Sequence, residues 1–434
     1  MRVAYNILFV LLFWLGEAWH FLKMWRRGNW RAGYGQRFAL YSPEIKAKLG
    51  WRPVLWLHAV SVGEVGICLH LLRALEPRLP QFQFVVSTTT STGMGELRRR
   101  LPAHIQAIYY PSDFAFVVSR ALKVIQPRAI ILLEAELWPN LLWQAQDRAI
   151  PLFLVNARLS ERSFKGYGRF AFIFRPIFSK FRAVGCQQAW DAQRLIALGF
   201  PAEAVRAVGN MKFDAAQLDS RLDVPGMLRQ IGVNTNAKLL VAGSTHAGEE
   251  AVLAEMLPRL RRRFPELFLI LVPRHFERAK EAGQELASRG IPFVYRSEIT
   301  GERQFPPGHF HCLVVNSTGE LKSFYERATL VFVGKSLTAK GGQSPIEPAA
   351  LGKAMVFGPN MQNFKAIVDA FLAGQAVVQV PDVAGLEQAI AELLGDDQRR
   401  SELGARALQV VRQNLGATER TVQLITERLG YSFV

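Results

Sequence analysis

The sequence has few cysteines and few acidic residues for its length. Only 3 of its 434 residues are cysteine, and Cys68, Cys186 and Cys312 have no paired spacing. This excludes a disulfide framework and a cysteine zinc site, and it is typical of free thiols in a reducing cytosol. Asp and Glu number 36 against 53 Lys and Arg, which gives a formal net charge of +17. That excess indicates an anionic partner, which would be a nucleic acid, an anionic membrane or a phosphorylated substrate.

Two nucleotide-binding motifs are also absent. Neither GxGxxG nor GxxxxGK[ST] occurs, which argues against an NAD-dependent enzyme and a P-loop NTPase. The sequence contains no short-period repeat and no low-complexity tract. Half of the residues are hydrophobic, so a chain of this length can bury the cores of two substantial domains.

The N-terminal segment lacks a full-length apolar run. Residues 7–15 are unbroken and apolar, but Glu17, His20 and Lys23 follow, and a spanning helix needs roughly 20 apolar residues. No small-residue cleavage site follows, so a removed signal peptide is not expected. Tryptophans beside an arginine cluster suit a membrane interface. We expect residues 1–30 to be a membrane anchor, inserted shallowly or crossing once, with its basic side cytoplasmic. The alternative is an ordinary buried N-terminal helix.

From Val54 onward, short β-type runs alternate with helical segments. The alternation is lost over residues 214–236, which are rich in Asp, Asn, Pro and Gly, and it restarts at Lys238. This pattern predicts an α/β fold with two doubly wound, Rossmann-like domains that face each other across a cleft. The expected boundaries are an N-terminal domain over 31–213, a linker over 214–236 and a C-terminal domain over 237–434 with a helical tail.

Glu64 lies where a predicted strand is followed by a predicted helix. Residues 54–57 have the composition of a buried parallel strand, and apolar residues with helical spacing follow Glu64. Gly63 permits a tight turn between them. Ligands of open α/β sheets bind at the carboxyl ends of strands, and a carboxylate there can act as a general base. The alternative is that Glu64 only complements the helix dipole.

Loops in the second half are suited to phosphate and ribose. Residues 243–245 and 317–321 place Gly, Ser and Thr before a helix, where free N–H groups favour anions. In residues 341–348, GGQSPIEP, two glycines bring the backbone close to a ligand, and Glu347 in the first helical turn can accept hydrogen bonds from ribose hydroxyls. The alternative is that these residues only cap and complement ordinary helices.

Several motifs together resemble those of the 3-deoxy-D-manno-octulosonic acid (Kdo) transferases of lipid A assembly. In chain order they are HAVSVGE (58–64), EAELWPN (134–140), NARLSERS (156–163), GNMKFD (209–214), AGSTH (242–246), VPRH (272–275) and GGQSPIEP (341–348). The resemblance implies a GT-B glycosyltransferase of lipopolysaccharide biosynthesis that transfers Kdo from CMP-Kdo to a lipid A precursor, lipid IVA. It implies no cofactor and no metal at the transfer centre. It also implies work at the cytoplasmic face of the bacterial inner membrane, with an anionic membrane surface as partner and no nucleic acid.

The resemblance also implies roles for individual residues. Glu64 would be the catalytic base, Glu347 would hold the ribose, and Lys212 would meet the Kdo carboxylate. The remaining donor-site candidates are Arg274, His275, Ser317, Thr318, Gly319, Glu320, Leu321 and Ser344. The acceptor-site candidates are Ser61, Gly63, Arg158 and Arg162, and the alternative for the two arginines is solvated surface charge.

The chain departs from the family pattern on the donor side. Gln343-Ser344 stands where the family often has His-Asn, Ala247 stands where Glu is common, and residues 359–364 differ from the more usual loop. Two other functions stay open. One is a different enzyme on the same scaffold, such as a UDP-sugar epimerase or another lipid glycosyltransferase. The other is a non-enzymatic, membrane-attached protein that binds anionic glycolipid or nucleic acid.

Overall fold

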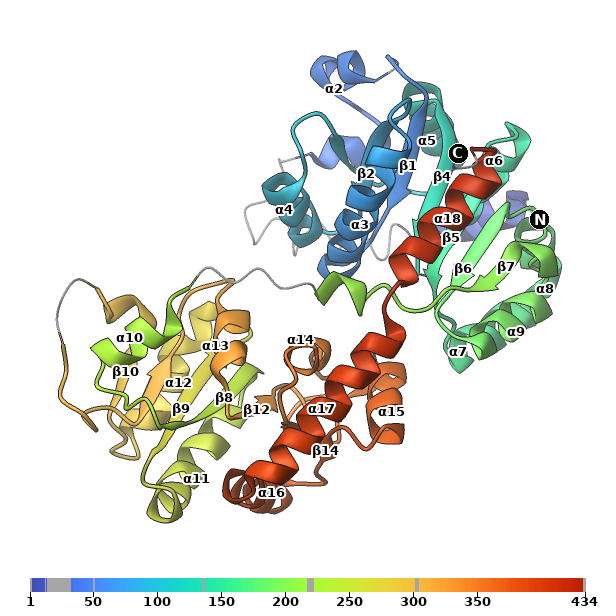
Figure 1. Ribbon diagram of the computed structural model, residues 1–434. Coiled ribbons are helices and arrows are strands. Elements are labelled where there is room, and N and C mark those ends of the chain that lie inside the picture. Colours follow the sequence, from blue (N-terminus) through green and yellow to red (C-terminus); the bar gives the residue numbers. More distant parts are fainter. Residues whose placement is uncertain are drawn as a thin grey trace. The chain divides into compact units, whose positions relative to one another are not determined.

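The computed structural model describes residues 2–11, 13, 33–49, 51–134, 137–216, 222–300 and 304–431. The chain divides into two compact units (Figure 1). Unit 1 is Met1–Ala215 together with Leu415–Val434, and unit 2 is Ala216–Asn414. Each unit contains one seven-stranded sheet whose paired strands are all parallel. The predicted α/β class with two doubly wound domains is therefore confirmed.

The sheet of unit 1 has the strand order β3-β2-β1-β4-β5-β6-β7. Its strands are β1 (Val54–His58), β2 (Gln83–Thr88), β3 (Gln106–Tyr109), β4 (Pro127–Leu133), β5 (Leu152–Ala157), β6 (Ala183–Cys186) and β7 (Val205–Ala207). The order reverses between β1 and β4, and the carboxyl ends of strands at such a reversal are where α/β sheets bind ligands.

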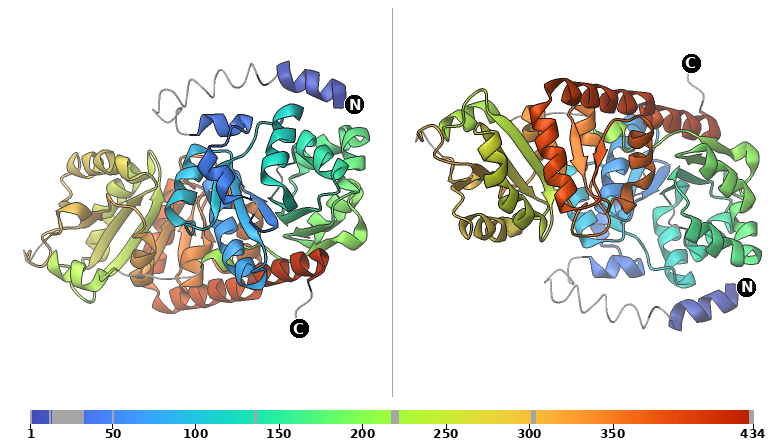
Figure 2. Two further views of the ribbon diagram at one scale, coloured as in Figure 1. Left: turned by 90° about the horizontal axis from the view of Figure 1, so that it is seen from above. Right: turned by 90° about the horizontal axis from the view of Figure 1, so that it is seen from below.

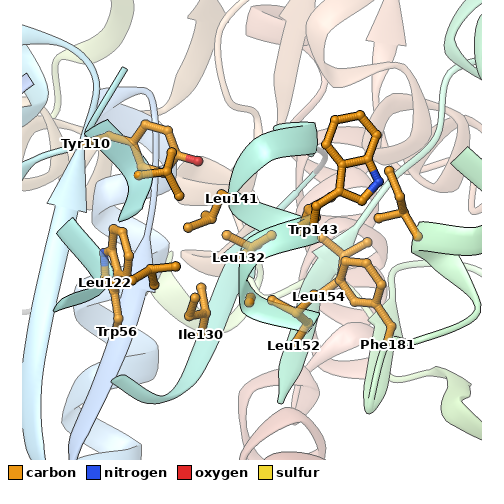
Figure 3. Packing of buried hydrophobic residues seen from close by; sticks show 14 of the residues in the cluster. Trp56, Tyr110, Leu122, Ile130, Leu132, Leu141, Trp143, Leu152, Leu154 and Phe181 are labelled. Carbon is orange, nitrogen blue, oxygen red and sulfur yellow. The ribbon is translucent and has the colours of Figure 1, made fainter. Parts of the chain in front are cut away.

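Helices cover both faces of this sheet, which explains why its strands are continuous apolar runs. Trp56, Ile130 and Leu132 point to one core together with helices α5, α6 and α8, and Figure 3 shows Leu141 and Trp143 of α6 in that packing. Leu57 and Ile131 point to the other core, with α3 and α18. The helices are α2 (Pro43–Lys48), α3 (Val62–Leu75), α4 (Ser91–Arg100), α5 (Ala115–Ile125), α6 (Pro139–Asp147), α7 (Glu161–Arg169), α8 (Ala171–Phe178), α9 (Ala189–Ala197) and α18 (Ala417–Leu429).

Unit 2 repeats the plan with the strand order β10-β11-β9-β8-β12-β13-β14. Its strands are β8 (Lys238–Thr245), β9 (Leu267–Pro273), β10 (Phe293–Tyr295), β11 (Cys312–Val314), β12 (Leu330–Val333), β13 (Met355–Phe357) and β14 (Val378–Gln379). Its helices are α10 (Val224–Gln230), α11 (Glu249–Arg263), α12 (Ala279–Ala287), α13 (Leu321–Arg327), α14 (Ile346–Ala350), α15 (Lys365–Ala373), α16 (Val383–Gly395) and α17 (Asp397–Asn414). The edge strands β10 and β14, which have three and two residues, were not predicted from the sequence.

The predicted domain boundary at the C-terminus is wrong. Residues 415–434 belong to unit 1, not to a C-terminal domain over 237–434. The Asp214 carboxylate accepts the N–H groups of Gly416 at 2.7 Å and Thr418 at 2.5 Å, which satisfies the amino end of α18. Arg420 donates to the Val208 carbonyl at 2.8 Å, and buried Ile425 completes the apolar contact. A helical pattern in the sequence indicates the helix but not the sheet that it covers.

The predicted linker over 214–236 also needs correction. Asp214 belongs to unit 1 because it holds α18. Helix α10 belongs to unit 2, where it packs against α13. Asp223 caps its start, because the side chain of Asp223 accepts the N–H of Gly226. Within this stretch, residues 217–221 lie outside the described residues.

Residues 2–11 form a helix that packs on unit 1. The Tyr5 hydroxyl donates to the Asp113 carboxylate at 2.9 Å, and the Phe9 ring meets the edge of Phe114 with centroids 5.2 Å apart. The opposite face leaves Ile7 59% and Leu11 59% exposed. This helix and α18 lie on opposite sides of the unit (Figure 2). Among the described residues, no helix is long and apolar enough to cross a bilayer. Most of the predicted anchor, residues 14–30, lies outside the described residues.

Asp113 ties this helix to the sheet. Its side chain is only 2% exposed, and it accepts the N–H groups of Asn140 at 2.9 Å and Leu141 at 3.0 Å, which cap α6. Burial raises the pKa of Asp113 to about 7, although the hydrogen bonds that it accepts oppose the shift. The folded state therefore binds the Asp113 proton more tightly than the unfolded chain does.

We expect the Asp113→Asn variant to change how stability depends on pH. The stabilisation from a raised carboxyl pKa is complete below the unfolded pKa and is lost as pH rises through the folded pKa. Between about pH 4 and about pH 7, Asp113 should lower the free energy of unfolding of the wild type by up to about 1.4 kcal/mol per pH unit, and the variant should lack that slope. Urea unfolding across this range measures it. Asp147→Asn is the control, because Arg2 lowers the pKa of Asp147 and its contribution is lost only at lower pH. Equal slopes in wild type and Asp113→Asn would contradict the assignment.

Candidate active site

Glu64 caps the helix that carries it. Ser61 is the N-cap residue of α3, and its hydroxyl oxygen accepts the Glu64 N–H at 3.3 Å. The Glu64 carboxylate in turn accepts the N–H of Val60 at 2.9 Å and the hydroxyl of Ser61 at 2.8 Å. This reciprocal arrangement is a capping box. The Ser-x-x-Glu spacing in the sequence already contained that signal, which the sequence analysis did not use.

Two charged residues from other strand ends accompany Glu64. Glu134 directly follows β4 and has a positive φ of 60°, and its carboxylate lies 3.1 Å from the ammonium group of Lys212. Lys212 comes from the loop after β7, and that loop is held by the side chain of Asn156, which accepts the Met211 N–H at 3.0 Å. Glu136, the other acidic residue of this motif, lies outside the described residues.

The surroundings of Glu64 raise its pKa. Burial is the largest cause, and the negative charge of Glu134 acts in the same direction, whereas the N–H of Val60 opposes both. A carboxylate with a raised pKa holds a proton more strongly than an ordinary carboxylate, so it is a better general base once ionised. Glu64 and Glu134 follow β1 and β4, the two strands between which the order reverses. The predicted position of Glu64 at a ligand-binding strand end is therefore consistent with the fold.

The other predicted acceptor residues have different surroundings. Gly63 lies in the first turn of α3 without a positive φ, and an added side chain would meet only Ser61 Oγ at 3.9 Å. The tight turn predicted at Gly63 is therefore wrong. Burial raises the pKa of the Asp191 carboxyl, and the nearby charge of Arg158 opposes that shift. Arg162 is exposed on α7.

In unit 2, Glu347 faces two cations. It lies in the first turn of α14, and burial raises its pKa, whereas Lys322 and Arg274 lower it. Arg274 follows β9 and Lys322 lies in the first turn of α13, so three elements bring these charges together. Lys322 was missed by the sequence analysis, although it directly follows the predicted loop 317–321.

The other predicted donor residues lie in loops at the same strand ends. The Ser317 hydroxyl donates to Glu320, and Glu320 pairs with Arg296 at 3.2 Å. Helix α13 begins at Leu321 without a side-chain cap, and Thr318 and Gly319 before it are exposed. The ring centroids of His275 and His246 are 6.1 Å apart. The Ser344 hydroxyl accepts the Ile346 N–H at 3.4 Å at the start of α14.

The two glycines of the 341–348 motif are required by packing. Gly341 and Gly342 have φ values of 118° and 75°. A side chain at Gly341 would approach Asn363 Nδ2 to 2.8 Å, and one at Gly342 would approach Met361 Sδ to 2.5 Å. Close approach to a ligand was predicted here, but the backbone instead approaches the loop after β13.

Glu249, which the sequence analysis missed, joins two of these loops. Its buried carboxylate accepts the N–H groups of Lys335 at 2.7 Å, Ser336 at 2.9 Å, Leu337 at 3.0 Å and His246 at 2.9 Å. It thereby fixes the loop after β12 to the loop after β8, the strands between which the order of this sheet reverses. Only the spatial proximity of residues far apart in sequence identifies this role.

The described residues contain no group of three or more His, Cys, Asp and Glu side chains placed to hold a metal ion. The three cysteines, Cys68, Cys186 and Cys312, are free, as predicted, and all three are buried. Burial raises the pKa of the Cys68 thiol to about 12, so the thiol stays protonated at neutral pH.

Comparisons with known proteins identify relatives of this chain. Residues 32–215 match a family model described as 3-deoxy-D-manno-octulosonic-acid transferase (kdotransferase). A 3-deoxy-D-manno-octulosonic acid transferase of Bordetella pertussis is 34% identical over 426 residues, 94% of this chain and 96% of that protein. One of Haemophilus influenzae is 32% identical over 372 residues, 86% of each chain.

Solved structures show the same fold in more distant proteins. A putative UDP-N-acetylglucosamine 2-epimerase from Listeria monocytogenes is 13% identical, with a TM-score of 0.59 over 88% of this chain and 100% of that chain. A UDP-GlcNAc 2-epimerase from Neisseria meningitidis is 12% identical, with a TM-score of 0.59 over 86% of this chain and 100% of that chain. At this identity the likeness concerns the fold alone.

We expect Glu249→Gln to destabilise unit 2. An amide supplies one acceptor oxygen and turns an NH₂ group toward backbone N–H groups, and each buried donor left unpaired costs about 1–3 kcal/mol. The free energy of unfolding should fall by about 2–4 kcal/mol, as measured by chemical denaturation. Glu255→Gln, at an exposed position of the same helix, is the control and should change it by less than about 0.5 kcal/mol. Indistinguishable effects of the two variants would refute the role given to Glu249.

Proposed function

Because the chain belongs to the 3-deoxy-D-manno-octulosonic acid transferase family and is a glycosyltransferase, we propose that its donor is CMP-Kdo and its acceptor is a lipid A precursor, lipid IVA. The observation that carries the proposal is Glu64, a carboxylate with a raised pKa at the strand reversal of unit 1. The likeness to the UDP-sugar epimerases concerns the fold alone, whereas the relatives at 34% and 32% identity are Kdo transferases. The transfer inverts the configuration at the anomeric carbon.

Glu64 acts as the general base in this proposal. The ionised carboxylate takes the proton of the acceptor hydroxyl while the hydroxyl oxygen attacks the anomeric carbon of Kdo. The capping hydrogen bonds from Val60 and Ser61 hold the carboxylate in place, so little reorganisation is needed at the moment of attack. Gly63 leaves open space beside Glu64, and Arg158 and Arg162 are proposed to meet phosphates of the lipid acceptor.

The donor is held by unit 2. The bond between the anomeric carbon and the phosphate oxygen breaks, and CMP leaves with the electron pair. Arg274 and Lys322, which both act on the pKa of Glu347, stabilise the charge that develops on the phosphate, in place of a metal ion or other cofactor. Glu347 accepts hydrogen bonds from the ribose. Burial raises the pKa of its carboxyl, and the charges of Lys322 and Arg274 oppose that shift. Lys212 is proposed to meet the Kdo carboxylate, which must then compete with Glu134 for the ammonium group.

The proposed location is the cytoplasmic face of the bacterial inner membrane. The lipid acceptor requires contact with a bilayer, and the helix formed by residues 2–11 exposes Val3, Ile7, Leu8 and Leu11 on the face that does not pack against unit 1. The charge of +17 favours an anionic lipid surface.

We expect Glu64→Gln to lower turnover by about 10²–10⁴-fold, because the amide keeps the size of the side chain but cannot take a proton. CMP binding should stay within about twofold of the wild type. The control is Glu44→Gln, an exposed first-turn glutamate of α2, which should leave turnover unchanged. A wild-type rate for Glu64→Gln would make Glu64 only a helix cap.

The raised pKa of Glu64 predicts how the activity depends on pH. Since the pKa of Glu64 is raised, the acid limb of kcat/KM should lie above the usual carboxylate range, and activity should rise as Glu64 ionises. Glu134→Gln removes a charge that raises this pKa, so the limb should move to lower pH. An unmoved limb would mean that another group controls it.

We expect Glu347→Ala to weaken cytidine and CMP binding by a similar factor of about ten or more, because a lost charged hydrogen bond to the ribose costs about 1.5–3 kcal/mol. Arg274→Gln should weaken CMP but not cytidine, because it removes a phosphate contact. Calorimetric titration separates these outcomes, with exposed Glu402→Ala as the control, and UDP should bind more weakly than CMP. Unchanged CMP affinity in Glu347→Ala would place the nucleotide elsewhere.

We expect the double variant Ile7→Asp/Leu11→Asp to sediment less with vesicles that contain anionic lipid. Both substitutions place negative charge on the exposed face of the helix and leave the face that packs on unit 1 unchanged. Leu372→Asp/Val383→Asp, at exposed positions of unit 2, is the control. Equal loss of sedimentation in both would remove the membrane role of this helix.

A further inference from the structure

Unit 1 contains a cavity at the amino ends of its strands, opposite to the end of the sheet where Glu64 lies. Arg128 lies at the start of β4 and Arg182 directly precedes β6, so both belong to the amino ends of parallel strands, whereas Glu64 follows a carboxyl end. The cavity has a volume of about 530 Å³, and Lys180 and Arg428 also line it. Arg428 comes from the last turn of α18, so the cavity is complete only when this C-terminal helix packs on unit 1.

The cavity is lined by four cations and by no acidic side chain. Within the part of the chain that the structure describes, none of the four forms a salt bridge with a carboxylate. Two acidic residues are adjacent in sequence to the lining. Asp147 pairs with Arg2 at 2.6 Å and Glu427 pairs with Arg206 at 2.8 Å, and the charge of Arg428 acts on Glu427 as a weaker contribution. Four like charges around one cavity repel one another, and an anion in the cavity would remove that repulsion.

Backbone carbonyl groups hold part of this cluster in place. Arg182 donates from Nε to the carbonyl of Arg428 at 3.0 Å, and the Arg428 guanidinium donates to the carbonyl of Glu203. These bonds orient both guanidinium groups without neutralising their charge. The groups keep further N–H donors, and Arg128 and Lys180 make no side-chain hydrogen bond within the described residues.

The chemistry of the lining favours phosphate. Arginine presents a planar set of donors that matches two oxygens of a phosphate, and lysine supplies a compact charge. A phosphate monoester carries nearly two negative charges at neutral pH, so it neutralises more of this cluster than a carboxylate does. The cavity size is within the range of small-molecule sites, and Ile150 and Leu429 supply an apolar wall.

We propose that this cavity is a binding site for a phosphate monoester or pyrophosphate group, separate from the site of Kdo transfer. The phosphate belongs either to a soluble molecule or to a lipid headgroup, and both present the same chemistry to the four cations. Because Arg428 belongs to α18, a bound phosphate also strengthens the packing of the C-terminal helix on unit 1.

The test uses the full chain with inorganic pyrophosphate as probe, in excess CMP and at constant ionic strength. The variant is Arg128→Gln/Lys180→Gln, which removes two charges from the lining and no side-chain hydrogen bond. The matched control is Arg98→Gln/Lys123→Gln, which removes one arginine and one lysine from exposed positions of α4 and α5. We expect saturable binding to one site, weakened at least about tenfold by the variant and less than about twofold by the control. No saturable binding, or equal weakening by both, would overturn the proposal.

A second arm identifies the source of the phosphate. Neutral phosphatidylcholine vesicles with and without phosphatidic acid replace pyrophosphate as the probe. A loss of vesicle binding in the cavity variant beyond that of the control assigns the site to a lipid phosphate. A loss with pyrophosphate alone assigns it to a soluble ligand. Kdo transfer should be unchanged in both double variants, because all four residues lie away from the catalytic end of the sheet. A transfer defect confined to the cavity variant would overturn the separation of the two sites.

Discussion

Carboxylate oxygens that accept backbone N–H groups hold the loops at the carboxyl ends of both sheets. Glu64 does so for the loop after β1, Asp113 for the start of α6, and Glu249 for the loops after β8 and β12. Helix starts and tight loops leave N–H groups without partners, and a buried carboxylate satisfies several of them at once. The position of Glu64 depends directly on this pairing, because its own carboxylate caps the helix that carries it.

The same pairing suits both the helix cap that Glu64 forms and the general base that we propose it to be. As a cap it must keep a fixed position, and as a base it must bind a proton. Burial and the charge of Glu134 raise its pKa, while the N–H of Val60 keeps its ionised form accessible. A free side chain on the surface would have neither the fixed position nor the increased basicity. The capping role of Glu64 and its proposed role as a general base are therefore compatible, because the capping box fixes the position of the carboxylate.

The sequence was most informative where a functional side chain lies directly beside a strand or helix that has a clear sequence pattern. Strands buried on both faces appear as unbroken apolar runs, so β1, β4 and β8 were predictable, and Glu64 was recognisable from the strand before it and the helix after it. The pairing of Glu249 with residues 335–337 was not predictable, because it depends on side-chain contacts across 86 residues or more of sequence. Gly341 and Gly342 were correctly identified as special, but their partner is another loop. The packing of α18 on unit 1 likewise has no local signal.

The roles proposed for the residues of both units depend on the identity of the reaction. The most direct measurement is to incubate the full-length protein with CMP-Kdo and a tetraacylated lipid A precursor and to determine the mass of the lipid product. The account predicts a lipid heavier by one or more Kdo residues, with one CMP released for each residue added. An unmodified lipid, or a lipid modified only when a UDP-sugar replaces CMP-Kdo, would contradict it.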